Sequence, residues 1–218
     1  MISRRSMLKG VALLGASPAF AYRDQSVILL DGVDVLSMVY PFRDHRYYGY
    51  RPSIAIPPPG RSPRSGIDLD GFFALHPVLE PLLPHFRSGY LTFHHACRTD
   101  VQTGTALSWN SSVNQGGVDG SMAGLFADLA AGLDRRARRV RREGGSVACV
   151  FRGGRSVREN ASGGTDPGGA GLVIAISAQS AGGRVEADWP GLAFDQLDRG
   201  LYLRSTRTIN PATSGELH

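Results

Sequence analysis

Four short hydrophobic runs along the chain predict the strands of a central sheet. They cover residues 26–30, 90–95, 146–151 and 171–177 and are rich in aliphatic and β-branched side chains. Uninterrupted runs of this length are typical of strands that are buried on both faces. The first run passes into Asp31-Gly32-Val33-Asp34, so a parallel strand is expected to lead into a functional loop at this point.

Hydrophobic residues between positions 120 and 142 recur with the period of an α-helix. At about 100° per residue they fall within a sector about 120° wide. They are Met122, Leu125, Phe126, Leu129, Leu133, Ala137 and Val140. Gly144 and Gly145 end the helix. Of the six arginines of residues 135–142, all but Arg136 lie outside the sector. They stand at the helix end where positive charge complements the dipole, which favours a solvated face over a nucleic-acid patch.

Two proline-containing segments precede the second hydrophobic run. Residues 41–66 combine prolines and turn residues with closely spaced tyrosines, which predicts a structured surface excursion. Residues 76–86 are amphipathic, and Pro77 suits the start of a helix. Pro81 and Pro84 are expected to kink or shorten that helix.

The order of these elements predicts the fold class. Strand, helix, strand, loop, strand is the alternation that builds a parallel sheet through right-handed crossovers. We therefore expect one α/β domain over residues 22–218, with a mostly parallel central sheet flanked by helices. The loops that follow the strands would gather at one edge of that sheet, where ligands usually bind.

Residues 1–21 have the pattern of a twin-arginine export signal. Arg4 and Arg5 precede the apolar run 10–16 and an A-x-A type cleavage site that ends at Ala21. The run is far shorter than the roughly 20 residues that a membrane span needs. We therefore expect a periplasmic or secreted protein that meets the Tat translocase during export and has no permanent membrane span.

The charge of the chain argues against nucleic acid as a partner. The sequence holds 24 basic and 19 acidic residues, a net charge of +5. Cleavage after Ala21 would remove the positive charges of Arg4, Arg5 and Lys9 and no negative ones, so the net charge would fall to +2. A nearly neutral protein has no overall attraction for a polyanion.

The cysteines and the adjacent histidines give weak metal-ligand signals. Cys97 and Cys149 match no paired spacing of zinc or redox motifs, and the sequence leaves open whether they bond to each other. His94 and His95 are neighbours on a predicted strand and point to opposite faces, so at most one of them faces a site.

A series of short stretches carries a family resemblance. They are residues 30–38, 40–41, 47–48, 51–52, 55–57, 69–73, 75–77, 114–116, 155–166 and 188–192. In this order they resemble the Tat-exported bacterial proteins of domain of unknown function 1501. The resemblance implies a reduced alkaline phosphatase/sulfatase-like α/β fold, with metal ligands on loops at the C-terminal ends of the strands.

The resemblance also implies a metal centre that this chain keeps only in part. Asp34 matches the acidic residue in the loop after the family's first strand, and Asp166 matches the aspartate of a later Thr-Asp-His-Gly motif. Four other matched positions hold residues that are poor ligands for zinc or carry the wrong charge. They are Asn110 and Ser112 in place of Asp and His, Arg152 in place of Glu, and Pro167 in place of His.

Two functions of different classes follow from these residues. We expect a non-catalytic binding or partner protein without a cofactor, whose partner is a periplasmic protein or a small anionic ligand. The alternative is a metal-dependent hydrolase of phosphate or sulfate esters, which needs a divalent metal on Asp34, Asp166 and a third ligand. Arg155 and Arg158 are candidates for anion binding, and an internal ion pair that fixes their loop is an equally good interpretation. A shortened gene product that folds poorly is a third hypothesis.

Overall fold

The predicted hydrophobic runs form strands. The computed structural model describes residues 25–97, 105–107, 121–152, 154–167, 171–178, 183–187, 189 and 191–192. The four predicted strands are confirmed as β1 (Gln25–Asp31), β5 (Leu91–Cys97), β7 (Ser146–Arg152) and β10 (Gly171–Ser177). Every residue of β5 and β10 is buried, which explains why their sequences lack the alternation of a half-exposed strand.

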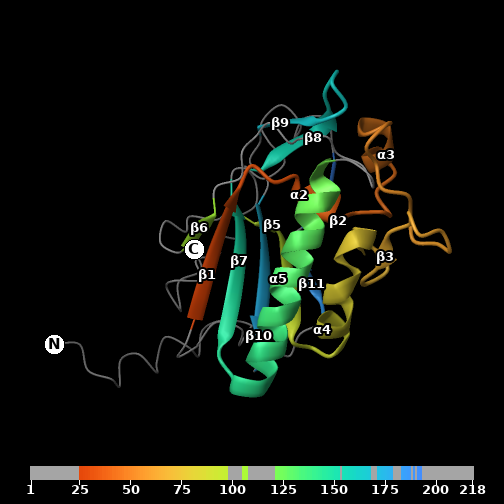
Figure 1. The fold of residues 1–218 in the computed structure, drawn as a ribbon. Helices are drawn as coiled ribbons and strands as arrows, with labels where there is room; N and C mark the ends of the chain where they lie inside the picture. The colour runs from red at the N-terminus through yellow and green to blue at the C-terminus, as the bar shows by residue number, and fades with distance from the viewer. Residues whose placement is uncertain are drawn as a thin grey trace.

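The sheet is mixed in direction. Six strands follow the order β11-β5-β10-β7-β1-β6, with β6 (Thr105–Leu107) and β11 (Val185–Ala187) at the two edges (Figure 1). β1 is parallel to β6 and β7, and β11 is parallel to β5. β10 runs antiparallel to both of its neighbours, β5 and β7. The prediction of a mostly parallel α/β sheet flanked by helices is therefore wrong.

The connection between β7 and β10 causes this difference. A parallel neighbour needs a crossover of about a dozen or more residues, usually a helix, that carries the chain back along the sheet. The described residues between these strands instead form a hairpin of β8 (Arg155–Glu159) and β9 (Thr165–Pro167). The chain therefore turns at the edge where β7 ends, and β10 returns in the opposite direction.

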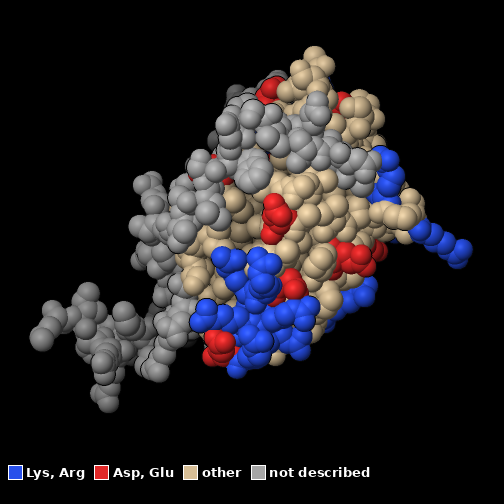
Figure 2. All heavy atoms as spheres, viewed as in Figure 1, with Lys and Arg blue, Asp and Glu red and all other residues tan. Residues whose placement is uncertain are grey.

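In the described part of the chain, one long helix packs on the sheet. α5 (Ser121–Glu143) confirms the predicted helix, and the other described helices have six residues or fewer. Its apolar side, with Phe126 and Leu133, joins the main core cluster together with side chains such as Cys149 and Ile174 from the facing strands. The opposite side of α5 is exposed and arginine-rich (Figure 2). Among the residues described, α5 therefore covers one face of the sheet.

The two proline-containing segments also fold as expected. α2 (Val35–Met38), β2 (Val39–Tyr40) and α3 (Arg46–Tyr50) lead into the excursion, and β3 (Ile67–Asp68) and β4 (Ala74–Leu75) close it in a small sheet of order β2-β4-β3. The prolines then shorten the amphipathic segment into a 3-10 helix, η3 (Pro77–Leu82), followed by α4 (Leu83–Arg87).

The buried tyrosines show how the excursion is held. The rings of Tyr40 and Tyr47 stack with their centroids 5.0 Å apart. The Tyr40 hydroxyl donates to the Pro57 carbonyl at 2.7 Å. A Cβ at Gly66 would lie 1.8 Å from that hydroxyl, so only glycine lets the end of the excursion close over Tyr40.

Loops from distant parts of the sequence meet at one end of the sheet. Asp31 at the end of β1 is level with Arg152 at the end of β7, and Leu172 near the start of β10 is level with Phe151. The loop after β1 and the β8–β9 hairpin therefore lie at the same end (Figure 1). Although the strand directions differ from the prediction, the two loops that carry Asp34 and Asp166 do come to one edge.

No helix among the described residues is long and apolar enough to cross a membrane. The predicted export signal, residues 1–21 with Arg4 and Arg5, lies outside the described residues. The expected periplasmic location therefore stays a prediction.

Candidate functional site

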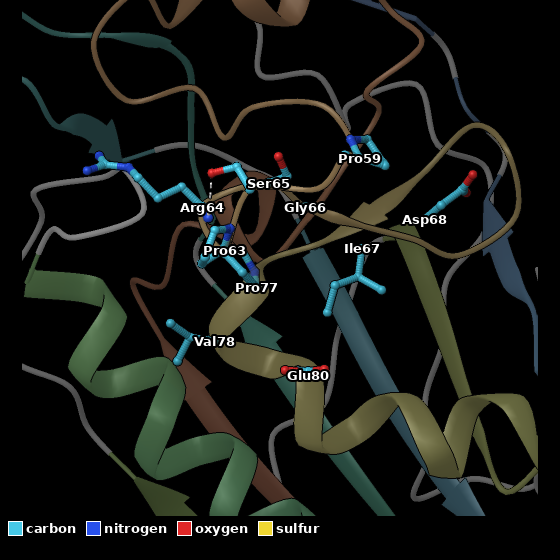
Figure 3. Close-up of a pocket in the computed structure, with 12 residues that line it drawn as sticks. Pro59, Pro63, Arg64, Ser65, Gly66, Ile67, Asp68, Pro77, Val78 and Glu80 are labelled. Atoms are coloured by element: carbon cyan, nitrogen blue, oxygen red, sulfur yellow. Dashed lines mark hydrogen bonds between the residues drawn. The ribbon is translucent and has the colours of Figure 1, made fainter.

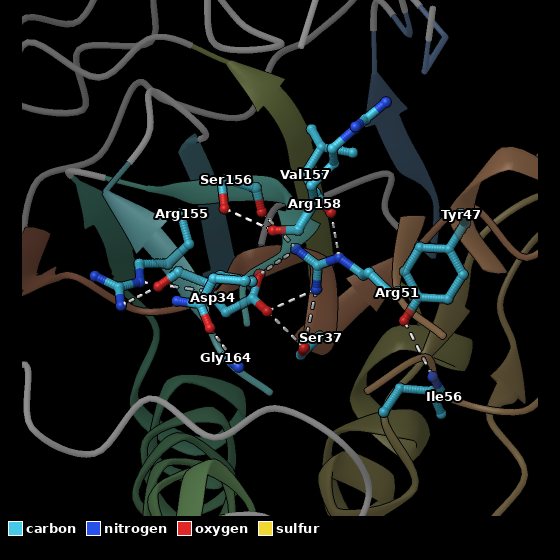
Figure 4. A network of polar contacts seen from close by, with 12 residues as sticks. Asp34, Ser37, Tyr47, Arg51, Ile56, Arg155, Ser156, Val157, Arg158 and Gly164 are labelled. Atoms are coloured by element: carbon cyan, nitrogen blue, oxygen red, sulfur yellow. Dashed lines mark hydrogen bonds and ion pairs between the residues drawn. The ribbon is translucent and has the colours of Figure 1, made fainter. Parts of the chain in front are cut away.

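A buried ion pair occupies the position where the sequence predicts a metal ligand. Asp34 is 4% exposed and lies directly before α2, and Arg51, one residue after α3, is fully buried. The Arg51 guanidinium faces the Asp34 carboxylate in a bidentate arrangement (Figure 4). Nη1 donates to Oδ2 at 2.6 Å and Nη2 donates to Oδ1 at 3.0 Å. Both carboxylate oxygens of Asp34 are therefore engaged by a cation from its own chain.

The remaining donors of Arg51 tie this pair to the β8–β9 hairpin. Nε donates to the Val157 carbonyl at 2.7 Å, and Nη2 donates to the Ser156 carbonyl at 2.8 Å. Nη1 also reaches the Ser37 hydroxyl at 3.3 Å, and that hydroxyl donates to Asp34 at 2.7 Å. A guanidinium has five N–H groups, and these five contacts use all of them. The group is suited to a structural role because no donor is left for a ligand.

Tyr47 forms the floor under Arg51. The guanidinium carbon lies 5.8 Å from the centre of the Tyr47 ring, an arrangement that favours a cation over an aromatic face. The Tyr47 hydroxyl accepts a hydrogen bond from the Ile56 backbone N–H at 3.2 Å. Burial raises the pKa of Tyr47 well above its usual value, although the nearby Arg51 acts in the opposite direction. Tyr47 therefore stays neutral and acts as a packing group.

Asp166 lies in the same network but in a different environment. Its side chain is exposed, and the carboxylate accepts a hydrogen bond from the Asn160 amide at 3.0 Å. Its backbone N–H donates to the Ser156 hydroxyl at 3.0 Å, while the Ser156 carbonyl accepts from Arg51. Ser156 thus contacts Asp166 through its hydroxyl and Arg51 through its carbonyl. The Asp34 carboxylate is buried and paired, whereas the Asp166 carboxylate is solvated.

This set of donors does not fit a divalent metal. A cation on Asp34 would have to displace Arg51, which would leave the buried guanidinium without its counter-charge. Among the residues that the structure describes, no group of three or more histidine, cysteine, aspartate or glutamate side chains is placed to hold a metal ion. The described residues therefore do not fit the divalent metal that the family resemblance implies.

The two candidate anion-binding arginines lie in different surroundings. Arg155 is 7% exposed, and its guanidinium donates to the carbonyl and the hydroxyl of Thr165 across the hairpin. Arg158 is exposed, with its guanidinium carbon 4.9 Å from the centre of the Tyr50 ring. In Figure 4 the two side chains extend in different directions from β8. Arg155 therefore ties the hairpin together from inside, whereas Arg158 packs on an aromatic ring at the surface.

The remaining residues of the implied metal centre are only partly described. Asn110 and Ser112 lie outside the described residues. Arg152 is the last residue of β7 and Pro167 is the last residue of β9, and the structure describes their backbone positions only. The charge reversal expected at Arg152 stays a prediction.

No family model, curated protein or solved structure matches this chain. The resemblance to the family of domain of unknown function 1501 therefore stays a prediction from the sequence.

The adjacent histidines point to opposite faces of β5, as expected. His95 Nε2 lies 2.7 Å from the Val39 carbonyl, and its Nδ1 accepts from the Ala96 N–H at 2.7 Å, so the ring is neutral and carries its proton on Nε2. Burial lowers the pKa of His95 to about 4, although the bond to Val39 opposes this shift. His94 Nδ1 instead lies 3.1 Å from the carboxylate of Glu186 on β11. Each histidine has a structural partner, and the two do not share a site.

A second tie to the hairpin was not expected from the sequence. The Glu159 carboxylate accepts hydrogen bonds from the Ser53 hydroxyl and, at 2.9 Å, from the Ser53 N–H. Burial acts to raise the pKa of Glu159, but the bonds from Ser53 outweigh it and the pKa falls below the usual value. Arg51 and Ser53 flank Pro52, so one short stretch holds the hairpin at two points. The sequence signal for this region is Arg51, which directly follows the closely spaced tyrosines of residues 47–50.

A separate cavity of about 630 Å³ lies between the end of the excursion and η3 (Figure 3). Prolines and the aliphatic side chains of Ile67 and Val78 line it, together with the carboxylates of Asp68 and Glu80. The Arg64 guanidinium extends away from Glu80 in Figure 3. Such a lining favours binding of an apolar, positively charged group over an anion. The cavity shares no lining residue with the Asp34 network.

Proposed function

We propose that this protein is an exported, non-catalytic binding protein that descends from a metal-dependent relative and has lost its metal centre. The single observation that carries the proposal is the bidentate ion pair between Arg51 and Asp34. A hydrolase of phosphate or sulfate esters needs convergent anionic and imidazole ligands that hold cations and activate a nucleophile. Here a permanently charged guanidinium takes the place that such a cation would need.

The expected partner is a periplasmic protein or another macromolecular surface rather than a small anion. Arg155 and Arg158, the candidates for holding a small anion, are engaged by Thr165 and Tyr50 respectively. The cavity beside η3 has a volume in the range of ligand sites, but two carboxylates line it. The export signal predicted for residues 1–21 supports a role outside the cytoplasm.

Metal analysis of the protein purified from the periplasm tests this proposal. We expect substoichiometric zinc, manganese and calcium, and no rise in melting temperature when any of these ions is added. Hydrolysis of p-nitrophenyl phosphate and p-nitrophenyl sulfate should not exceed that of a buffer control.

Asp166→Asn is the informative variant for this experiment. Asp166 is exposed, so its substitution tests the metal site without disturbing the core. Stoichiometric metal that is lost in Asp166→Asn, together with ester hydrolysis that falls in the same variant, would overturn the proposal in favour of the hydrolase. Ser162→Ala, in the same hairpin, is the matched control.

A further inference from the structure

The exposed side of α5 concentrates the positive charge of the molecule. Arg135, Arg136, Arg138, Arg139, Arg141 and Arg142, here called the arginine surface, are all exposed. They cover the C-terminal end of α5, where Figure 2 shows a continuous basic patch. Residues 134–143 hold these six arginines and two acids, a net charge of +4, against +5 for the whole chain.

Intramolecular pairing neutralises only part of this charge. Arg138 bonds to Asp134 at 2.9 Å and Arg139 bonds to Glu143 at 2.6 Å, each one turn away along the helix. The bond from Arg138, opposed by burial and aided by His85, holds the pKa of Asp134 below its usual value. Asp134 and Glu143 are thus paired with arginines of the same helix. The other four arginines are not paired with an acid among the described residues.

Those four arginines differ in how they are held. Arg136 donates to the Gly132 carbonyl at 3.2 Å, and the Arg141 guanidinium carbon lies 4.8 Å from the centre of the Tyr90 ring. Arg135 and Arg142 have no ion-pair or hydrogen-bond partner among the described residues. These two side chains are the ones most available to an external anion.

The fold keeps the arginine surface facing outward. Leu133, Ala137 and Val140 alternate with the arginines and are buried in the core, so the helix cannot rotate. The rise of about 1.5 Å per residue spreads the arginines along roughly 10 Å of helix. The result is a convex, rigid surface whose guanidinium groups are suited to planar contacts with phosphate oxygens.

We propose that the arginine surface docks the protein on membranes that contain anionic phospholipid. Each arginine near such a surface adds to the attraction, and a cluster of this size is typical of lipid recognition. The ligand chemistry is the phosphodiester headgroup. A single-stranded nucleic acid would instead need stacking platforms, whereas the Tyr90 ring, the aromatic group in contact here, is covered by Arg141. The inference does not depend on the loss of the metal centre.

Vesicle co-sedimentation of the full chain tests the proposal. We expect binding to vesicles of equal parts phosphatidylcholine and phosphatidylglycerol and no binding to phosphatidylcholine alone. The affinity should fall as salt shortens the Debye length from about 30 to about 8 Å. Arg135→Gln with Arg142→Gln should weaken binding about 30-fold, the effect expected for two arginines at an anionic surface.

Arg46→Gln with Arg61→Gln is the matched control, because both arginines are exposed in the excursion and the change in net charge is the same. This control should reduce binding less than about 3-fold. Equal losses in the two double variants would mean that only net charge matters, and would overturn the proposal. Tighter binding to a single-stranded oligonucleotide than to the anionic vesicles at the same salt would also overturn it.

Discussion

The side chain of Arg51 shows how one residue can decide the chemistry of a loop. A carboxylate in the loop after a buried strand is a natural metal ligand, and Asp34 has that position. Arg51 donates to both oxygens of Asp34, and its remaining N–H groups donate to two carbonyls of β8 and to the Ser37 hydroxyl. The same pair therefore both neutralises the carboxylate and holds the hairpin against the loop.

Breaking this buried pair from one side should be costly. Asp34→Asn or Arg51→Met alone is expected to lower the free energy of unfolding by about 3–5 kcal/mol, because each leaves one buried group without its partner. The double variant should lose less than the sum of the two, and urea denaturation of all three variants gives the coupling.

Ser37→Ala is the control for this cycle, because it removes a neutral hydroxyl and leaves the ion pair in place. Its expected cost is about 1 kcal/mol. Strict additivity of the Asp34 and Arg51 variants would contradict a direct interaction between the two charges.

His95 predicts a pH-dependent loss of stability. Its pKa is about 4 in the folded protein and 6.5 when unperturbed, so the unfolded chain binds the proton more readily between these values. The contribution of neutral His95 to the free energy of unfolding is fully present above about pH 6.5 and is lost as the pH falls towards 4. The total loss is about 3 kcal/mol. Urea unfolding of the protein and of His95→Gln from pH 7 to 4 measures this change. The difference between their stabilities should shrink on acidification, and a constant difference would show that His95 does not titrate as expected.

At the scale of elements, the β8–β9 hairpin determines the topology. It stands between β7 and β10, where the sequence predicted a loop leading to a parallel strand, and it makes β10 antiparallel to both neighbours. Asn160 organises its turn: the side-chain carbonyl accepts from the Ser162 and Gly164 N–H groups, each at 3.0 Å. Gly163 has a φ of +69°, the left-handed conformation that glycine adopts without strain.

Asn160→Ala should loosen this turn. The substitution removes the two bonds to the turn amides and the bond to Asp166, at an expected cost of about 1–2 kcal/mol for partly solvated bonds. Hydrogen exchange at the Gly164 amide should accelerate. Ser162→Ala, whose side chain makes no hydrogen bond among the described residues, should leave both measurements unchanged. Unchanged exchange in Asn160→Ala would mean that Arg51 and Glu159 hold the hairpin without help from the turn.

Features that depend on neighbouring residues were predictable from the sequence, and features that depend on distant residues were not. The strands and α5 were predictable because hydrophobic runs and helical periodicity can be read from residues that are neighbours in the sequence. The direction of β10 was not, since it depends on how residues 153–170 connect two strands, and their glycine-rich sequence carries no periodicity. Asp34 was identified as the key acid, but its partner Arg51 is brought to it by the fold of the excursion, and only the proximity of the tyrosines hinted at that burial.

At the scale of the whole molecule, the two faces of the sheet keep the cysteines apart. Cys149 lies in the core cluster under α5, whereas Cys97 belongs to the smaller cluster on the other face. Both are buried thiols outside any disulfide, and β10 separates their strands. The sequence left their pairing open, and the geometry of a disulfide, which needs the two Cβ atoms to face each other, excludes it in this fold.

Thiol titration checks this arrangement. Burial raises the pKa of Cys149 to about 12, although Arg136 acts to lower it, so the thiolate is scarce at neutral pH. The native protein should react with Ellman's reagent at a small fraction of the rate of free cysteine, and two thiols per chain should react in guanidinium chloride. Absence of both thiols in denaturant after purification without reductant would indicate an oxidised pair and a different packing of the sheet.

The position of β1 inside the sheet has a consequence for how the chain is made. Its neighbours β6 and β7 begin at Thr105 and Ser146, so a nascent chain leaves the ribosome with Ile28, Leu29 and Leu30 unprotected until those later strands emerge. Contacts this far apart in sequence form slowly, and an uncovered aliphatic strand invites aggregation in the meantime. The sheet therefore cannot close around β1 until the chain has been made at least as far as β7, which places the greatest risk of misassembly before the last third of synthesis.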